Sequence, residues 1–254
     1  MSALAEFLEW DSWFFGVRVA RLLGDTLDDA TAGRALDWCR REQIDCLYFL
    51  ADADSTETVL AAEKHGFGLK DVRVTYHRRL DSSLGETLPA LPPGVVIRPS
   101  WPGEANDLQA LAAGNYTESR FYHDGRFPRA KVDEMYRVWV RQSVEGQANV
   151  VLVLESEGRA RGFITCHLLD AKTGQCRLGG LDPALRGCGL GKQMYESALR
   201  WFAQHGVETV VYVTQARNIR AQRLFQRLGF LSHSTQLWYH KWFERGTAAQ
   251  RAAA

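Results

Sequence analysis

The segment LRGCGLGK, residues 185–192, places three glycines between two basic residues. The segment before it, QCRLGGLD (175–182), is typical of a strand. Glycines let the backbone adopt positive φ and approach a ligand closely, and the first turn of a helix offers free N–H groups. The pattern therefore predicts a phosphate-binding turn between a strand and a helix. The helix is indicated by apolar residues at helical spacing, namely Leu190, Met194, Tyr195, Ala198, Leu199 and Phe202.

Two common phosphate-binding loops do not fit this segment. A P-loop needs Ser or Thr after its lysine to hold Mg²⁺, and here Gln193 follows Lys192. The dinucleotide pattern G-x-G-x-x-G needs a wider final gap, and no suitable acidic residue follows about 20 residues on. The glycines at positions 187, 189 and 191 need another interpretation.

The run R-G-x-G-x-G at a helix start, after a strand that ends at a proline, resembles motif A of the GCN5-related N-acetyltransferases (GNAT). The resemblance implies acetyl-CoA (coenzyme A) as cofactor and an α/β (α+β) GNAT fold with a mixed, mostly antiparallel sheet. It also implies that main-chain amides of the loop hold the pyrophosphate, with Arg186 and Lys192 as candidate charges. The loop residues so assigned are Arg186, Gly187, Cys188, Gly189, Leu190, Gly191 and Lys192.

A second motif lies about 30 residues further on. The segment RNIRAQRLFQRLGF (217–230) resembles the family pattern N-x-x-A-x-x-L-Y-x-x-x-G-F. Asn218 is a suitable N-cap for the short helix, and the resemblance implies that Asn218 and Ala221 face the cofactor. The resemblance also implies that the strand around Gly179, Gly180 and Leu181 splays from its neighbour and pairs with the pantetheine arm. Glycine within a strand fits a bulge or a close backbone approach.

Phe225 departs from this pattern, because many family members have a tyrosine there that protonates the departing thiolate. Phenylalanine cannot donate a proton. Three explanations stay open: another donor serves, the thiolate leaves unaided with a pKa of about 8.5, or the chain only binds an acyl-CoA. The candidate donors are Tyr239, His240, Tyr212, His167 or a water molecule, and His167 and His240 are also candidate bases for the amine.

The acceptor amine is suggested by a wider resemblance. The segments 8–22 and 118–140 are similar to the dTDP-fucosamine acetyltransferases, which acetylate the 4-amino group of a nucleotide-linked 4-amino-4,6-dideoxy sugar. A nucleotide sugar offers a diphosphate to an arginine and a base for aromatic stacking. Another amine stays open: an amino acid, a polyamine, an antibiotic or a protein N-terminus. The candidate acceptor residues, on a predicted loop, are Tyr116, Ser119, Arg120 and Phe121.

The segment 85–100 carries four prolines, which disfavour long regular structure and indicate a linker. We therefore predict a smaller N-terminal αβ domain over 1–84 that resembles a partial GNAT, a linker over 85–93, and a GNAT domain over 94–244. The tail 245–254 is predicted to be frayed. HGF…YHR in the first domain and LGF…YHK in the second share one spacing, which reflects either coincidence or a decayed half-copy.

Composition narrows the remaining function classes. The formal net charge of +1 provides no general basic field for nucleic acid or a membrane surface. Five cysteines without a C-x-x-C pair argue against a disulfide framework and against a zinc site, and no metal is implied. A start without signal-peptide features, together with this cysteine usage, favours a cytoplasmic protein. The expected partner is a small-molecule amine, and the sequence leaves open whether the chain forms a homodimer.

Overall fold

The computed structural model describes residues 4–80, 90–101 and 103–244. The described chain divides into two compact units that are each discontinuous in sequence. Unit 1 contains residues 4–73, 119–127 and 235–244, and unit 2 contains the described parts of 74–118 and 128–234. The predicted domains were continuous, so the segment 119–127 and the last strand join the first unit against that expectation. The predicted tail 245–254 and most of the predicted linker 85–93 lie outside the described residues.

Unit 1 is a small sheet with helices, in the hydrogen-bonded order β1-β2-β3-β10-β4. β2 runs parallel to β3, and β10 runs antiparallel to β3. Both main helices begin at a side-chain cap: the Asp28 side chain accepts from the Thr31 N–H, and Ser55 accepts from the Thr58 N–H. The elements of unit 1 are β1 (Ala5–Phe7), α1 (Glu9–Phe15), β2 (Val19–Leu22), α2 (Asp29–Arg41), β3 (Cys46–Asp52), α3 (Thr56–Lys64), α5 (Arg120–Asp124), the start of β4 (Gly68–Arg79) and most of β10 (Leu231–Trp242).

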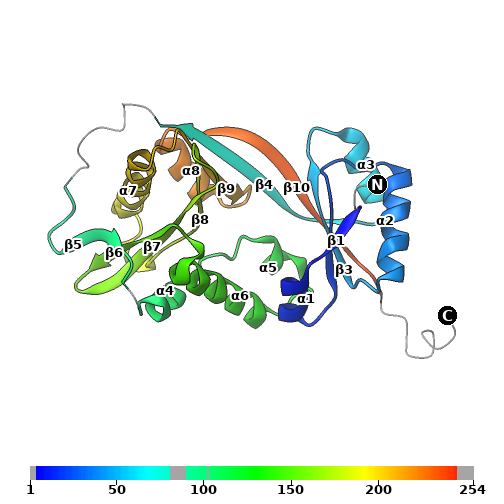
Figure 1. Ribbon diagram of the computed structural model, residues 1–254, viewed down its shortest axis with the longest axis horizontal. Helices are drawn as coiled ribbons and strands as arrows, with labels where there is room; N and C mark the ends of the chain where they lie inside the picture. The colour runs from blue at the N-terminus through cyan, green and yellow to red at the C-terminus, as the bar shows by residue number, and fades with distance from the viewer. Residues whose placement is uncertain (1–3, 81–89, 102, 245–254) are drawn as a thin grey trace. The chain divides into compact units, whose positions relative to one another are not determined.

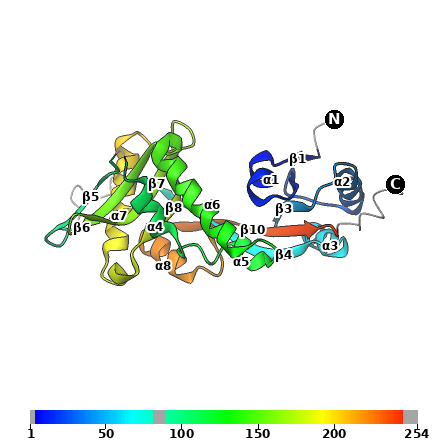
Figure 2. The same ribbon diagram turned by 90° about the horizontal axis from the view of Figure 1, so that it is seen from below.

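Alternating side chains give the unit 1 sheet two different faces. Leu47, Phe49 and Tyr239 pack into a hydrophobic core with residues of α2 and α3. Tyr48 points to the other face, where its ring contacts Phe121 and Phe127. Figures 1 and 2 show α1 and α2 on opposite sides of β1–β3.

Unit 2 contains a mixed, mostly antiparallel sheet in the order β4-β9-β8-β7-β6-β5, as predicted. Within the described residues, β5 pairs antiparallel with β6, β6 with β7, and β7 with β8. β8 then pairs parallel with β9. Its elements are the end of β4, β5 (Val95–Pro99), α4 (Ala105–Ala112), α6 (Arg129–Gln142), a π-helical turn (Ser143–Gln147), β6 (Val150–Ser156), β7 (Arg159–Leu168), β8 (Thr173–Leu181), a 3₁₀ turn (Pro183–Leu185), α7 (Leu190–Gln204), β9 (Thr209–Gln215), α8 (Ile219–Arg227) and the start of β10.

Helices cover both faces of this second sheet. Val151, Val153 and Phe163 pack with residues of α4 and α6. Leu152, Leu154 and the apolar side of α7 form the larger core on the other face. Figure 1 shows α4 and α6 below the strands and α7 above them. This two-layer cover explains why β6 begins with a continuous apolar run, residues 150–154.

Two short helices were not expected from the sequence. The predicted loop around residues 115–126 contains α5, and the aromatic segment after Leu8 forms α1. All five cysteines are free. Among the described residues no helix has the length and apolar character needed to cross a membrane.

Candidate active site

The central feature of unit 2 is a fork between two parallel strands. β8 pairs with β9 over Thr173–Cys176 against Thr209–Tyr212. Beyond this point the described part of β8 pairs only with β7, through Gly179, Gly180 and Leu181. One edge of β8 therefore keeps backbone N–H and C=O groups that another extended chain or ligand can bind. This opening is the splay that the family resemblance implied.

A β-bulge opens the fork. The register between β7 and β8 shifts between Ile164 and Cys166, so two residues of β8 lie opposite Thr165. The Thr165 hydroxyl accepts a hydrogen bond from the Leu178 N–H at 3.0 Å, which satisfies a donor that the bulge removes from the ladder. The predicted bulge therefore exists, just before Gly179. It bends β8 away from β9 at the point where the two strands separate.

Packing explains the two glycines of β8. A Cβ atom at Gly179 would lie 2.8 Å from the Tyr195 hydroxyl oxygen, and one at Gly180 would lie 2.9 Å from the Phe163 ring. Either contact is too short for real atoms, so larger residues would displace these rings. The glycine at position 179 thus brings a tyrosine hydroxyl from α7 directly against the face of β8, which the sequence pattern alone did not reveal.

The glycine loop has the conformation that a phosphate cradle needs. Gly187 and Gly189 have φ of 89° and 87°, a region that L side chains rarely adopt. Gly189 is the N-cap of α7, and no side chain satisfies the N–H groups of that first turn. A Cβ at Gly187 or Gly189 would meet nothing within 4 Å, so open space surrounds the turn. Free donors, open space and the helix dipole together fit a diphosphate.

The two basic residues of the loop have partners in unit 2. Arg186 donates to the Asn115 side chain at 2.5 Å, and its Nε lies 3.4 Å from the Leu181 carbonyl oxygen. Lys192 pairs with Glu196 at 2.8 Å on the surface of α7. Exposed pairs of this kind contribute little to stability. Both cations therefore remain available to exchange these partners for an anion.

Asn218 caps α8 as predicted. Its side-chain oxygen accepts a hydrogen bond from the Ala221 N–H at 3.1 Å. Ala221 itself packs against the core of unit 2. The implied contact of these two residues with the cofactor stays a prediction.

We expect Asn218→Ala to lower the free energy of unfolding by about 1 kcal/mol, because it removes the N-cap. Asn218→Asp keeps a capping oxygen and is expected to preserve stability. If the amide also contacts the cofactor, the aspartate variant loses acetyl-CoA affinity without losing stability. Denaturant unfolding and calorimetric titration of both variants test the two roles. Equal stability of the alanine variant and the wild type would contradict the capping role.

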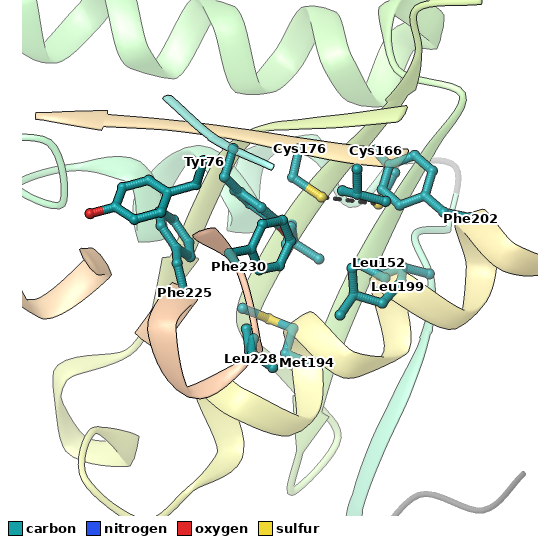
Figure 3. Packing of buried hydrophobic residues seen from close by; sticks show 14 of the residues in the cluster. Tyr76, Leu152, Cys166, Cys176, Met194, Leu199, Phe202, Phe225, Leu228 and Phe230 are labelled. Atoms are coloured by element: carbon teal, nitrogen blue, oxygen red, sulfur yellow. Dashed lines mark hydrogen bonds between the residues drawn. The ribbon is translucent and has the colours of Figure 1, made fainter. Parts of the chain in front are cut away.

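Phe225 lies in a cluster of tyrosines. Its ring stacks on Tyr212 at 4.5 Å between centroids and contacts Tyr76 at 5.6 Å and Tyr195 at 5.9 Å. Figure 3 shows Phe225 beside Tyr76 in this packed cluster. The Tyr76 hydroxyl donates to Gln222 at 3.0 Å. Burial raises the pKa of Tyr195, so its hydroxyl keeps its proton at neutral pH.

The predicted acceptor residues fall into both units. In unit 2, Tyr116 stacks on Tyr136 at 4.3 Å, and its hydroxyl lies beside the Gly179 backbone. In unit 1, Ser119 is buried and precedes α5, and Phe121 packs against Phe15 at 5.8 Å. Arg120 is the first residue of α5. The structure therefore places the predicted loop residues in an ordered aromatic setting.

Arg120 and His240 contact each other, although the sequence suggested separate roles for them. Arg120 Nε donates to His240 Nε2 at 3.2 Å. The other ring nitrogen, Nδ1, lies 2.5 Å from an Asp124 carboxylate oxygen. Burial, with the nearby Arg120 charge, lowers the pKa of His240 to about 4. His240 is therefore neutral at pH 7 with both nitrogens engaged, which leaves no free lone pair for a substrate proton.

The other two predicted catalytic residues are buried. The Tyr239 ring lies in the core of unit 1, where burial and Glu63 raise the pKa of its hydroxyl. His167 lies on β7 opposite Gln175, at the paired end of the fork. Burial, together with the Arg177 charge, lowers the pKa of His167 to about 4, which makes it a weak base. Their catalytic roles stay predictions that this geometry does not favour.

We expect the melting temperature to fall as the pH is lowered from about 6.5 towards 4. His167 and His240 have folded-state pKa values of about 4, below the ordinary histidine value. The unfolded chain therefore binds these protons first, and stability present above pH 6.5 is lost on acidification. Thermal melts across this range test the expectation. His167→Asn should reduce the slope of melting temperature against pH across this range, and an unchanged slope would contradict the assignment.

Comparison with known proteins agrees with this geometry. Residues 114–230 match the family model described as acetyltransferase (GNAT) family. The spore coat polysaccharide biosynthesis protein SpsD of Bacillus subtilis is 27% identical over 153 residues, which are 59% of this chain and 52% of SpsD. A mycothiol acetyltransferase of Pseudarthrobacter chlorophenolicus is 28% identical over 181 residues, 68% of this chain and 54% of that protein. The chain thus spans about half the length of these curated relatives.

The fold also matches solved structures of this class. A tandem GNAT protein from the clavulanic acid biosynthesis pathway aligns with a TM-score of 0.65 at 14% identity, covering 91% of this chain and 77% of that one. At this identity the likeness shows the fold alone. It agrees with a GNAT unit accompanied by a smaller partial unit. Residues 114–230 thus match the model of the GNAT family of acetyltransferases, a family that uses acetyl-CoA as its acyl donor.

Proposed function

We propose that this chain is an acetyl-CoA-dependent N-acetyltransferase that acts on the 4-amino group of a nucleotide-linked 4-amino-4,6-dideoxy sugar. The observation that carries the acetyl-CoA part is the fork at Gly179–Leu181 beside the uncapped start of α7. When bound, acetyl-CoA would supply an acetyl thioester. The amine nitrogen bonds to the acetyl carbon as the C–S bond breaks. The nitrogen loses one proton, and the departing thiolate gains one to become the thiol. No metal is needed for this transfer.

The chain's own groups have separate tasks in this reaction. The free edge of β8 binds an extended ligand, and its N–H groups near Gly180 polarise a carbonyl oxygen. The first-turn N–H groups of α7 hold a diphosphate. Tyr195 keeps a proton on its hydroxyl oxygen next to Gly179. We propose this hydroxyl as the proton donor, in place of the tyrosine hydroxyl that is absent at Phe225.

The sugar part of the proposal is supported by unit 1 and by one relative. Arg120 lies over the rings of Trp238 and Phe121, each with Cζ at 4.1 Å from the ring centroid. A cation among aromatic rings suits a ligand with both a phosphate and a base. SpsD, named for polysaccharide biosynthesis, is a relative whose name fits a sugar acceptor. The mycothiol acetyltransferases support a second candidate, a different small-molecule amine.

The test measures thiol release from acetyl-CoA with a thiol reagent, with and without a dTDP-4-amino-4,6-dideoxy sugar. We expect saturable release that depends on the sugar, and a mass gain of one acetyl group on the sugar. Release with another amine, but not with this sugar, would overturn the sugar assignment and keep the acetyltransferase. Tight acetyl-CoA binding without thiol release on a wide amine panel would overturn both and indicate a binding protein.

A further inference from the structure

Unit 1 contains a chain of hydrogen bonds that ends at Arg120. The Asp124 side chain is buried and receives three donors: His240 Nδ1 at 2.5 Å, Trp242 Nε1 at 3.0 and 3.1 Å from its two oxygens, and the Arg126 backbone N–H at 3.1 Å. Lys70 Nζ lies 4.0 Å away. These contacts outweigh the effect of burial and keep the pKa of Asp124 low. A buried carboxylate with this many partners has a fixed position.

The chemistry of arginine determines the direction of the chain. A guanidinium group has only donors, so His240 Nε2 must accept from Arg120 Nε. His240 is then protonated on Nδ1 and donates to Asp124. The ring is further held by stacking on Tyr48 at 4.5 Å. Asp124 therefore fixes the tautomer of His240, and His240 fixes the orientation of Arg120.

The Nη groups of Arg120 are not used in the hydrogen bond to His240, which involves Nε. Among the described residues, Arg120 forms a side-chain hydrogen bond with His240, and no carboxylate lies at ion-pair distance from its guanidinium group. The rings of Tyr48, Phe121 and Trp238 lie around its Cζ at 4.9, 4.1 and 4.1 Å. A half-buried cation that is oriented by one edge, with no carboxylate of the described residues at ion-pair distance, can bind an oxyanion through its Nη groups.

Other buried groups of unit 1 also have polar atoms without a partner. The Tyr48 hydroxyl, the Ser119 hydroxyl and Arg73 Nε are buried polar atoms without a hydrogen-bond partner among the described residues. The charge of Arg120 lowers the pKa of Arg73, after the larger effect of burial. Burial raises the pKa of the nearby Asp11 carboxyl, and the charge of Arg120 opposes this shift without cancelling it. Unsatisfied donors around two cations favour an anionic ligand over a cationic one.

We propose that Arg120 binds the diphosphate of the acceptor, and that His240 and Asp124 are positioning residues that hold its guanidinium group. This inference rests on the proposed function, because it takes the acceptor to be a nucleotide-linked sugar. It reassigns His240 from candidate base to an orienting role. It also gives Asp124, which sequence reasoning did not single out, a definite task.

The probes are dTDP and thymidine, each titrated into the full chain by calorimetry without acetyl-CoA. We expect dTDP to bind more tightly than thymidine, and Arg120→Met to weaken dTDP binding about 10- to 100-fold while leaving thymidine unchanged. Arg126→Met is the matched control, since Arg126 is exposed in the same segment and lies 5.4 Å from the Trp242 ring. It should change dTDP affinity by less than about twofold.

The positioning role has its own pair of variants. His240→Phe keeps a ring but cannot accept from Arg120, whereas His240→Gln keeps an acceptor oxygen. We expect the phenylalanine variant to weaken dTDP binding about 10-fold and the glutamine variant to retain most of it. Acetyl-CoA affinity, which depends on unit 2, should stay at the wild-type value in both. Equal dTDP affinity in the two His240 variants would overturn the positioning role.

The failures of the two proposals are distinguishable. Wild-type protein that binds dTDP no better than thymidine, or Arg120→Met protein that binds dTDP normally, overturns the diphosphate site even if acetyl transfer to another amine occurs. Arg120-dependent dTDP binding without any thiol release supports the diphosphate site and overturns the proposed acetyl transfer.

Discussion

Gly191→Asp is expected to weaken acetyl-CoA binding at least about 100-fold, which corresponds to about 3 kcal/mol. Gly191 lies in the first turn of α7, which contains no acidic residue. A carboxylate at this point competes for the N–H groups that we propose to hold the diphosphate, and it repels the diphosphate charge. Calorimetric titration of acetyl-CoA and of free coenzyme A measures the loss directly, without a need for the acceptor.

The fold itself should tolerate this substitution. A Cβ at Gly191 would meet only a Leu181 methyl group at 3.7 Å, which is an ordinary contact, and its φ is not positive. An acidic residue near a helix N-terminus stabilises the helix by about 0.3–1 kcal/mol, so the melting temperature should stay equal or rise. Gly33→Asp in α2 is the matched control, because a Cβ there meets nothing within 4 Å. Unchanged acetyl-CoA affinity in Gly191→Asp would contradict the assignment of the loop.

Most of the acetyl-CoA side of the site could be predicted because it depends on local backbone chemistry. Positive φ at Gly187 and Gly189, the capping by Asn218 and the bulge before Gly179 all follow from residue types at fixed spacing. Helical periodicity likewise predicted α7, whose buried residues include Leu190 and Met194. These features need only neighbours in the sequence to form.

The remainder depends on long-range contacts, which a single sequence does not reveal. Arg120 and His240 are 120 positions apart, and the sequence suggested one for acceptor binding and the other for catalysis. The local contact of Asp124 with the Arg126 N–H does not reveal its link to Arg120, because the side-chain donors His240 and Trp242 come from β10. The compact units cross the predicted boundary for the same reason, since residues 119–127 and 235–244 join strands from the first part of the chain.

The proposed proton donor is the clearest case of a residue that the sequence pattern concealed. Tyr195 was assigned only to the apolar side of α7, because its spacing fits a core position. Its hydroxyl reaches the strand only because Gly179 has no side chain, so two segments 16 positions apart must be considered together. A glycine opposite a large ring is a pattern that could have suggested this contact.

Tyr195→Phe is expected to lower kcat for thiol release about 100-fold with little change in KM, because it removes a proton donor and keeps the ring. Tyr76→Phe is the matched control: its ring also packs on Phe225, but its hydroxyl donates to Gln222. That variant should keep kcat near the wild-type value. Tyr116→Phe tests the other hydroxyl beside Gly179.

Phe225→Tyr provides a rescue of this variant. Phe225 contacts the Tyr195 ring, so a hydroxyl added at position 225 enters the same cluster and restores the residue that many GNAT proteins have there. We expect the double variant Tyr195→Phe/Phe225→Tyr to recover at least about one tenth of the lost rate. A kcat that does not respond to Tyr195→Phe would mean that the thiolate leaves without help from this side chain. The fork and the glycine loop would then provide catalysis by binding and orientation alone.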